Sequence, residues 1–103
     1  MTTSTRTKFT LPKINLNGTS AEDLFDEYID AQDAVRKALH ILQTCTYHGR
    51  DFQCNPADDY NQALFERAER LAKLDDVLDY CQAHIDNANE AMESWEFVFT
   101  TTS

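Results

Sequence analysis

Cysteine and histidine side chains in one short stretch of the sequence are of the types that bind a metal ion. Cys45, His48 and Cys54 are spaced C-x2-H-x5-C, and His40 lies five residues before Cys45. Zinc prefers thiolates and imidazoles, but this spacing matches no common zinc module. Cys45 and Cys81 also fall on expected helical stripes, where a thiol packs as a small hydrophobe. We therefore expect no metal site and, because three cysteines are an odd number, free buried thiols with no disulfide framework.

The same stretch places aromatic rings beside a cation. Tyr47, His48, Arg50 and Phe52 lie within one six-residue segment. Ring faces and a guanidinium suit a base and a phosphate, and Lys13 from the N-terminal arm could add a second cation. One hypothesis is therefore a pocket for an anionic nucleotide, formed most easily where two chains meet. The alternative is that Arg50 pairs with a nearby acid while Tyr47 and Phe52 only pack the loop.

Carboxylates dominate the charge of the chain, which has a formal net charge of −9. Residues 22–33 contain six acids and residues 74–103 contain seven, with no base in either segment, whereas residues 36–73 hold six bases and five acids. In an antiparallel hairpin the two acidic segments meet at one end, where they suit a basic protein surface. The acids expected to bind such a partner are Asp75, Asp76, Asp79, Asp86, Glu90 and Glu93.

Two alternatives limit this interpretation of the acidic segments. The basic residues Arg6, Lys8 and Lys13 of the N-terminal tail are the nearest cations in the sequence and could fold back onto the acidic end. Acidic helical faces are also commonly just solvated surface. Direct binding to nucleic acid is not expected for a chain of this charge.

No pattern typical of catalysis occurs in the sequence. Both G-x-S-x-G and H-E-x-x-H are absent, and two glycines are too few for a phosphate-binding loop. His84 lies three residues after Cys81, but we expect it to be a partly exposed helix residue and not a base. The sequence therefore predicts a binding protein without a cofactor and not an enzyme.

Apolar periodicity predicts a first helix over residues 20–46. Thr19 and Glu22 have the spacing of a capping box, which would start the helix, and Gly49 is expected to close it. A heptad stripe of apolar side chains follows, in the pattern of a coiled coil. Its members are Leu24, Tyr28, Ala31, Val35, Ala38, Leu42 and Cys45.

A second helix is predicted over residues 56–95. Asn55 is the expected N-cap and Pro56 suits the first helical position. Apolar residues recur at helical spacing up to Trp95, after which the alternation of residues 95–99 predicts a short terminal strand. The extended segment of residues 9–16 is its expected pairing partner, within one chain or between two.

The expected fold is all-α and has one domain. Residues 1–18 form a tail and an extended arm, residues 19–96 form the antiparallel hairpin and residues 97–103 form a C-terminal arm. A chain of 103 residues buries a small core, and apolar residues such as Phe25, Ile29 and Phe65 remain beside the main stripes. We expect homo-oligomerisation to complete a helical bundle. Without a run of eighteen apolar residues or a secretory signal, a cytoplasmic protein with no membrane partner is expected.

Residues 11–20 (LPKINLNGTS), followed by a helix and then Gly49-Arg50-Asp51-Phe52, resemble a group of small proteins encoded by tailed phages and prophages. Those proteins read L-P-x-I-x-L-N-G-T-S and later N-G-R-D-Y-Y. The match covers the first half of the chain well, and the second helix only by pattern. Here His48 replaces the Asn, and Phe52 and Gln53 replace the two tyrosines. The resemblance implies a phage or prophage origin and an all-helical accessory protein.

The resemblance further implies a role against host defence, because small acidic or oligomeric helical phage proteins often look like anti-defence factors. The leading hypothesis is therefore an anti-defence protein of the host cytoplasm that binds and blocks a host defence protein through its acidic surface. One alternative is an oligomeric sponge that sequesters an anionic, cyclic nucleotide signal. Another is a small structural or assembly protein of the virion.

Overall fold

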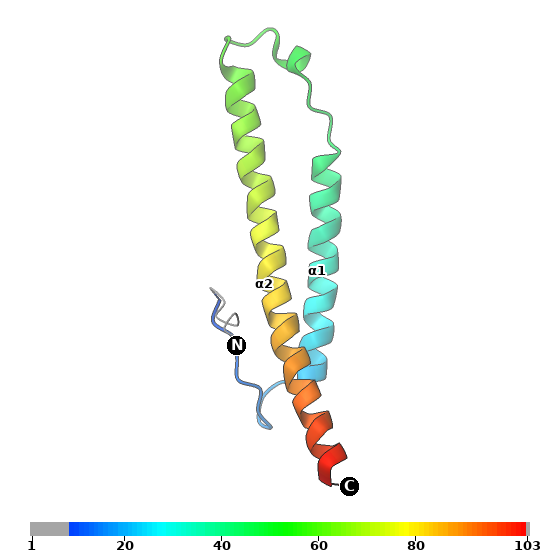
Figure 1. Cartoon of the computed structure of the whole chain (residues 1–103). Coiled ribbons are helices and arrows are strands. Elements are labelled where there is room, and N and C mark those ends of the chain that lie inside the picture. The colour runs from blue at the N-terminus through cyan, green and yellow to red at the C-terminus, as the bar shows by residue number, and fades with distance from the viewer. Residues whose placement is uncertain (1–8, 103) are drawn as a thin grey trace.

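The chain forms an antiparallel hairpin of two helices (Figure 1), in a computed structural model that describes residues 9–102, with side chains up to Ser94. Helix α1 spans Ala21–Gln43 and helix α2 spans Asp59–Thr102, and a 3-10 turn, η2 (Gly49–Phe52), lies in the connection between them. The molecule measures 72 × 24 × 21 Å. Residues 9–102 contain no strand, and the predicted all-helical hairpin is confirmed.

The two helices differ greatly in length. Helix α2 has 44 residues and helix α1 has 23, which correspond to about 66 Å and about 34 Å at 1.5 Å per residue. The C-terminal end of α2 continues past the start of α1 (Figure 1). None of the helices described is long and apolar enough to cross a lipid bilayer.

Helix α1 begins one residue later than the capping box predicted. The Ser20 hydroxyl accepts a hydrogen bond from the backbone N–H of Asp23 at 3.1 Å, so Ser20 is the N-cap. The preceding turn explains the difference, because the backbone N–H of Gly18 donates to the Asn15 carbonyl at 3.3 Å. Thr19 therefore joins this turn to the helix and does not cap it.

This cap gives a direct test of where α1 begins. We expect Ser20→Ala to lower the free energy of unfolding by about 1 kcal/mol, because a helix N–H loses its partner. Thr19→Ala is the matched control and should change it by less than about 0.5 kcal/mol. Urea unfolding followed by circular dichroism measures both, and a larger loss for Thr19→Ala would restore the predicted capping box.

The connection between the helices is longer than predicted at both ends. Helix α1 ends at Gln43, with the Thr44 hydroxyl donating to the Ile41 carbonyl at 2.8 Å, and Gly49 opens η2 instead of closing the helix. Helix α2 begins at Asp59 and not at Pro56. The side-chain amide of Asn55, the predicted cap, instead donates to the carboxylate of Asp59 at 3.1 Å.

The core lies between α1 and α2, and most of it, apart from Leu39, is in the half of the hairpin away from the loop. On α2 the buried residues are Cys81, His84, Ile85 and Ala88, and on α1 they are Gln32 and Leu39. The predicted stripe of α1 was wrong at Ala31, Ala38 and Leu42, which are exposed, and at Cys45, which is exposed beyond the end of the helix. Leu39 buries more apolar surface than Ala38 at the neighbouring position, so the helix turns this larger side chain inward.

A pair of glutamine side chains bridges the two helices. The amide of Gln32, buried in the seam, donates to the Gln82 carbonyl oxygen at 2.9 Å and to the backbone carbonyl of Leu78 at 3.4 Å. Gln82 in turn donates to the Asp86 carboxylate at 2.8 Å. These bonds offset the cost of burying an amide and explain how a polar residue occupies a core position.

The N-terminal arm packs along α2. The ring of Phe9 meets that of Tyr80 edge-on, with 5.2 Å between the centroids. The side-chain amide of Asn87 donates to the Pro12 carbonyl at 2.8 Å. This extended arm is therefore packed against α2 of the same chain.

The predicted terminal strand was wrong, because α2 continues as a helix through residues 95–102. Side chains of Trp95, Phe97 and Phe99, which suggested the strand, lie outside the described side chains. Continuing the helix pairs each backbone N–H with the turn before it, whereas a lone strand leaves these groups without a partner. The expected C-terminal arm of residues 97–103 is thus helical as far as Thr102.

Candidate functional site

Five carboxylates on α2 lie on one side of the helix. Asp75, Asp79, Asp86, Glu90 and Glu93, here called the acidic face, are all exposed. At about 100° per residue they fall within about 60° of one another around the helix axis. Asp76, which the sequence placed in the same surface, is also exposed but rotated about 100° from Asp75. The structure therefore brings five of the six predicted partner-binding acids onto one face.

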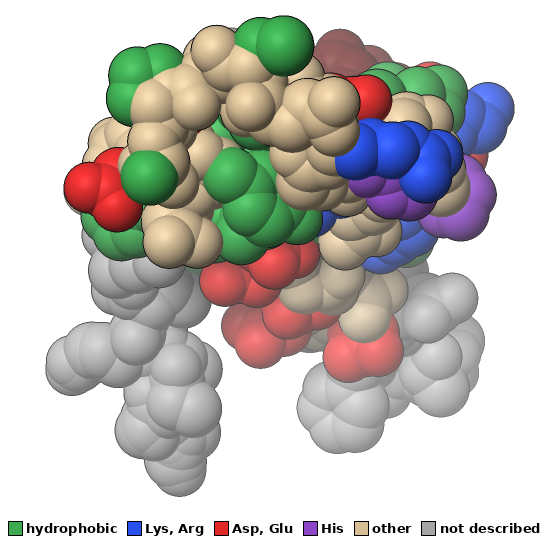
Figure 2. All heavy atoms as spheres, turned by 90° about the horizontal axis from the view of Figure 1, so that it is seen from above, with side chains coloured by type: hydrophobic (Ala, Val, Ile, Leu, Met, Phe, Trp, Pro, Cys, Tyr) green, Lys and Arg blue, Asp and Glu red, His purple; other side chains and the backbone are tan. Residues whose placement is uncertain are grey.

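Helix α1 adds more carboxylates to the same end of the molecule. Residues 22–33 of α1 carry Glu22, Asp23, Asp26, Glu27, Asp30 and Asp33, all exposed. Between described residues, ion pairs join Arg36 to Asp33 at 3.8 Å and Arg70 to Glu69 at 3.3 Å, both at the surface, where such pairs stabilise little. Figure 2 looks onto the loop end and shows Lys, Arg and His side chains gathered along one of its sides. The molecule is thus an electrostatic dipole with an acidic pole opposite the loop.

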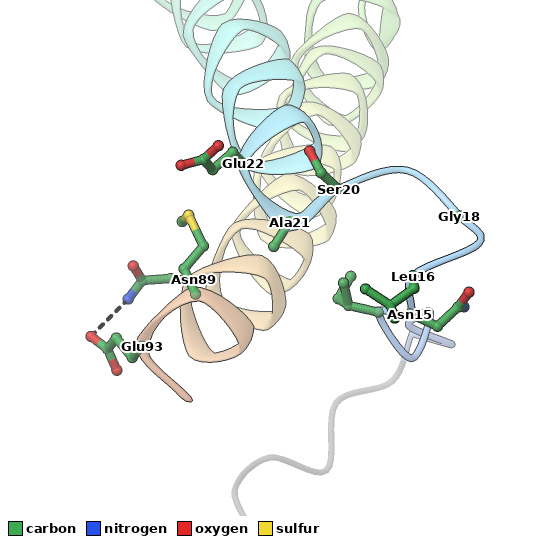
Figure 3. A pocket seen from close by; sticks show the side chains of 10 residues that line it. Asn15, Leu16, Gly18, Ser20, Ala21, Glu22, Asn89 and Glu93 are labelled. Atoms are coloured by element: carbon green, nitrogen blue, oxygen red, sulfur yellow. Dashed lines mark hydrogen bonds between the residues drawn. The ribbon is translucent and has the colours of Figure 1, made fainter. Parts of the chain in front are cut away.

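An open hollow of about 670 Å³ lies in the acidic pole, where the N-terminal arm, the start of α1 and α2 meet (Figure 3). Ile14 and Leu16 from the arm and Met92 from α2 give it apolar walls. Glu22 of α1 and Glu93 of α2 give it carboxylates, and Asn89 donates to Glu93 at 3.3 Å. Sequence periodicity could not reveal this hollow, because residues 14–22 form it together with residues 89–93, which lie far away in the sequence.

The loop end contains an aromatic cluster. The ring centroids of Tyr47, Phe52 and Tyr60 lie 5.6 to 5.9 Å apart. The guanidinium of Arg67 sits over the Tyr47 ring at 5.3 Å and donates to the Gln43 carbonyl at 2.9 Å. The Tyr47 hydroxyl is buried without a hydrogen-bond partner, and burial raises the pKa of Tyr47. The cluster thus fastens the loop onto α2 and onto the end of α1.

The predicted ligand-binding residues are only partly brought together. Tyr47 and Phe52 share the aromatic cluster, while His48 and Arg50 are exposed in the loop. Lys13 follows Pro12, whose carbonyl accepts from Asn87, and Asn87 is about 40 Å along α2 from Tyr60 at 1.5 Å per residue. Within one chain Lys13 therefore does not join the loop residues. Sequence reasoning missed Arg67, whose contact with Tyr47 depends on how the loop folds back.

A second aromatic cluster lies in the core near the arm. His84 stacks on Tyr28 with 4.3 Å between ring centroids, and Tyr80 meets His84 at 4.6 Å. His84 is buried and its Nε2 has no hydrogen-bond partner, so the prediction of a partly exposed histidine was wrong. Burial lowers the pKa of His84. A hydrogen bond with Tyr80, followed by burial, raises the pKa of Tyr28.

This buried histidine makes the stability depend on pH. The pKa of His84 in the folded chain lies below the usual 6.5. As the pH is lowered, His84 therefore binds a proton at a higher pH in the unfolded chain than in the folded chain. Stability is therefore full above about pH 7 and falls as the pH drops through 6.5 towards the lowered pKa. Urea unfolding at several pH values measures this fall. His84→Phe keeps the ring stacking and should flatten the curve in this window, and an unchanged curve would exclude His84 as the cause.

The cysteines do not assemble a metal site. Cys45 and Cys54 are exposed and Cys81 is buried, and all three are free thiols. The prediction of buried thiols is thus right for Cys81 alone, because Cys45 and Cys54 lie in the loop beyond the end of α1. Among the residues that the structure describes, no three or more His, Cys, Asp or Glu side chains form a group that could hold a metal ion.

Comparisons with protein-family models, with curated protein sequences and with solved structures gave no match. The chemistry of the chain itself, and above all of its acidic pole, is what indicates a function.

Proposed function

We propose that this protein is a phage- or prophage-encoded, non-catalytic interaction protein that blocks a component of host defence by binding its basic surface in the host cytoplasm. The acidic face of α2 is the observation that carries the proposal. Asp75 and Glu93 are 18 positions apart, which corresponds to about 27 Å of helix at 1.5 Å per residue. A fixed row of carboxylates matches Lys and Arg side chains that otherwise contact the phosphates of a nucleic acid.

The binding surface also includes the first half of α1. Its exposed carboxylates and those of α2 belong to antiparallel helices that pack against each other, so they share one pole. Long-range attraction of this kind accelerates encounter with a basic partner and weakens as salt is added. The proposal therefore requires binding that decreases steeply with ionic strength.

We further propose that two or more copies associate through the loop half of the hairpin. Apolar side chains are exposed there: Ile41 by 63%, Phe65 by 59% and Leu64 by 40%. The charges of residues 36–73 nearly balance, so copies can meet there while their acidic poles stay apart. Light scattering should give at least twice the mass of the 11.8 kDa chain, and a monomer at all concentrations would reject this assembly.

Sequestration of an anionic nucleotide by the loop end is less well supported. Tyr47 and Phe52 pack against each other and against Tyr60, and Arg67 covers the Tyr47 ring. These ring faces are thus already in contact within the chain. Arg50 and His48 remain exposed, which makes Arg50→Ala the variant that separates the two proposals. A structural role in the virion would instead show as the protein's presence in purified particles.

A phage infection assay tests the proposed function. The protein is expressed in a panel of bacterial strains, each carrying one defence system, and the plating efficiency of a restricted phage is measured. We expect the wild-type chain and Arg50→Ala to raise plating on at least one strain. A variant with amides at Asp75, Asp79, Asp86 and Glu90 should not. Loss with Arg50→Ala but not with the amide variant would favour the nucleotide sponge, and no effect on any strain would reject the proposal.

A further inference from the structure

The hollow in the acidic pole combines apolar walls with an acidic rim. Leu16 is the most exposed of the large hydrophobic residues described, at 84%. Ile14 and Met92 extend this apolar surface, and Glu22 and Glu93 border it. In Figure 3, Glu22 and Glu93 project from two different helices on the same side of the hollow, with Leu16 across from them.

The hollow is held open by contacts within the chain. The arm is fixed to α2 by the Phe9 and Tyr80 rings and by the hydrogen bond from Asn87 to Pro12. The turn at residues 15–18 is closed by the bond from Gly18 N–H to the Asn15 carbonyl, and Ser20 then starts α1. These restraints place Leu16 without needing a partner, so little ordering is required on binding.

We propose that this hollow receives a large apolar side chain from a basic partner, in a segment where Lys or Arg residues flank that side chain. The inference rests on the proposed function and specifies the chemistry of its partner. Charge complementarity selects this occupant, because Glu22 and Glu93 attract flanking cations while Leu16 and Met92 contact the apolar group. A second copy of this chain cannot dock here through its own acidic pole, since its carboxylates would meet those of the rim.

Three synthetic peptides of equal length test the inference by fluorescence anisotropy. The first has a central Leu-Leu pair flanked by lysines and arginines, the second has Ser-Ser in place of the leucines, and the third keeps the leucines but has glutamates as flanks. We expect the first peptide to bind about tenfold more tightly than the second, because the leucines leave water. The third peptide should not bind.

Leu16→Asn is the decisive variant, because an 84% exposed side chain can be replaced without disturbing the core. It should remove the tenfold preference for leucine while leaving the affinity for the Ser-Ser peptide unchanged. The conservative Leu16→Met should retain the preference. Circular dichroism confirms that both variants fold.

The outcomes separate this inference from the proposed function. Equal affinity for the two basic peptides, or a preference that survives Leu16→Asn, would overturn the hollow as a docking site while leaving the acidic pole as the binding surface. Equal binding of the acidic peptide would show that charge plays no part, and would overturn both. Failure of both basic peptides to bind at low salt would also reject both.

Discussion

Replacing Asp75, Asp79, Asp86 and Glu90 with the corresponding amides should weaken binding to a basic partner about 100-fold and yet make the fold more stable. The variant leaves a formal net charge of −5 in place of −9. If each lost charge pair contributed about 0.7 kcal/mol, affinity for the basic leucine peptide would fall about 100-fold. Like charges four residues apart, as at Asp75 and Asp79, destabilise a helix by about 0.2–0.5 kcal/mol per pair. Their removal should raise the melting temperature by a few degrees, about 4 °C per kcal/mol.

Two measurements check this prediction together. Thermal unfolding by circular dichroism should show that salt raises the melting temperature of the wild-type chain more than that of the variant. Anisotropy with the basic leucine peptide should show the loss of affinity. The matched control removes four acids from the loop half, with amides at Asp51, Asp58, Glu66 and Glu69. If this control lost binding equally, total charge and not the acidic face would be responsible.

Ile85→Ala should lower the free energy of unfolding by about 2–4 kcal/mol, because it leaves a cavity in the centre of the core. Ile85 is 6% exposed and packs in a core whose other buried apolar residues, among those described, are Leu39, Cys81 and Ala88. Small domains are stable by only about 5–15 kcal/mol, so this loss is a large part of the total. The described core has few other buried apolar side chains, so the packing lost at Ile85 is not compensated elsewhere.

Urea unfolding measures this effect, with Ile29→Ala as the matched control. Ile29 is 38% exposed, so truncating it should cost less than about 1 kcal/mol. The comparison removes the same atoms from two positions and therefore isolates burial. An equal loss of stability in the two variants would contradict the burial of Ile85 between α1 and α2.

The positions of the helices were predictable, but their side-chain detail was only partly so. Periodicity indicated both helices because a helix of this length must bury a stripe of apolar side chains. It could not distinguish Ala31 from Gln32 on α1, because the hydrogen bond that permits burial of Gln32 comes from the other helix. The choice between Thr19 and Ser20 as the cap similarly depended on the turn before them.

The candidate site was predicted where it follows from one helix and missed where it needs several segments. The acidic face repeats at helical spacing, so the sequence alone placed its residues together. The hollow joins Leu16 to Glu22 and Met92, and the contact of Arg67 with Tyr47 joins α2 to the loop. Contacts of this kind depend on how the chain folds in three dimensions, and the spacing of residues within one helix does not predict them. The terminal strand failed for a related reason, because alternation in residues 95–99 carries no information about a pairing partner.

The hydrogen bond from Gln32 to Gln82, here called the clasp, is an uncharged link between two helices whose acidic halves repel each other. Its donor and acceptor are amides, which neither gain nor lose a proton across the pH range in which carboxylates titrate. Salt that screens the carboxylates therefore leaves the clasp in place. The hydrogen bond from Gln32 to Gln82 therefore continues to join the two helices when salt screens the negative charge of the pole, so the protein can present the same pair of helices to its partner at different ionic strengths.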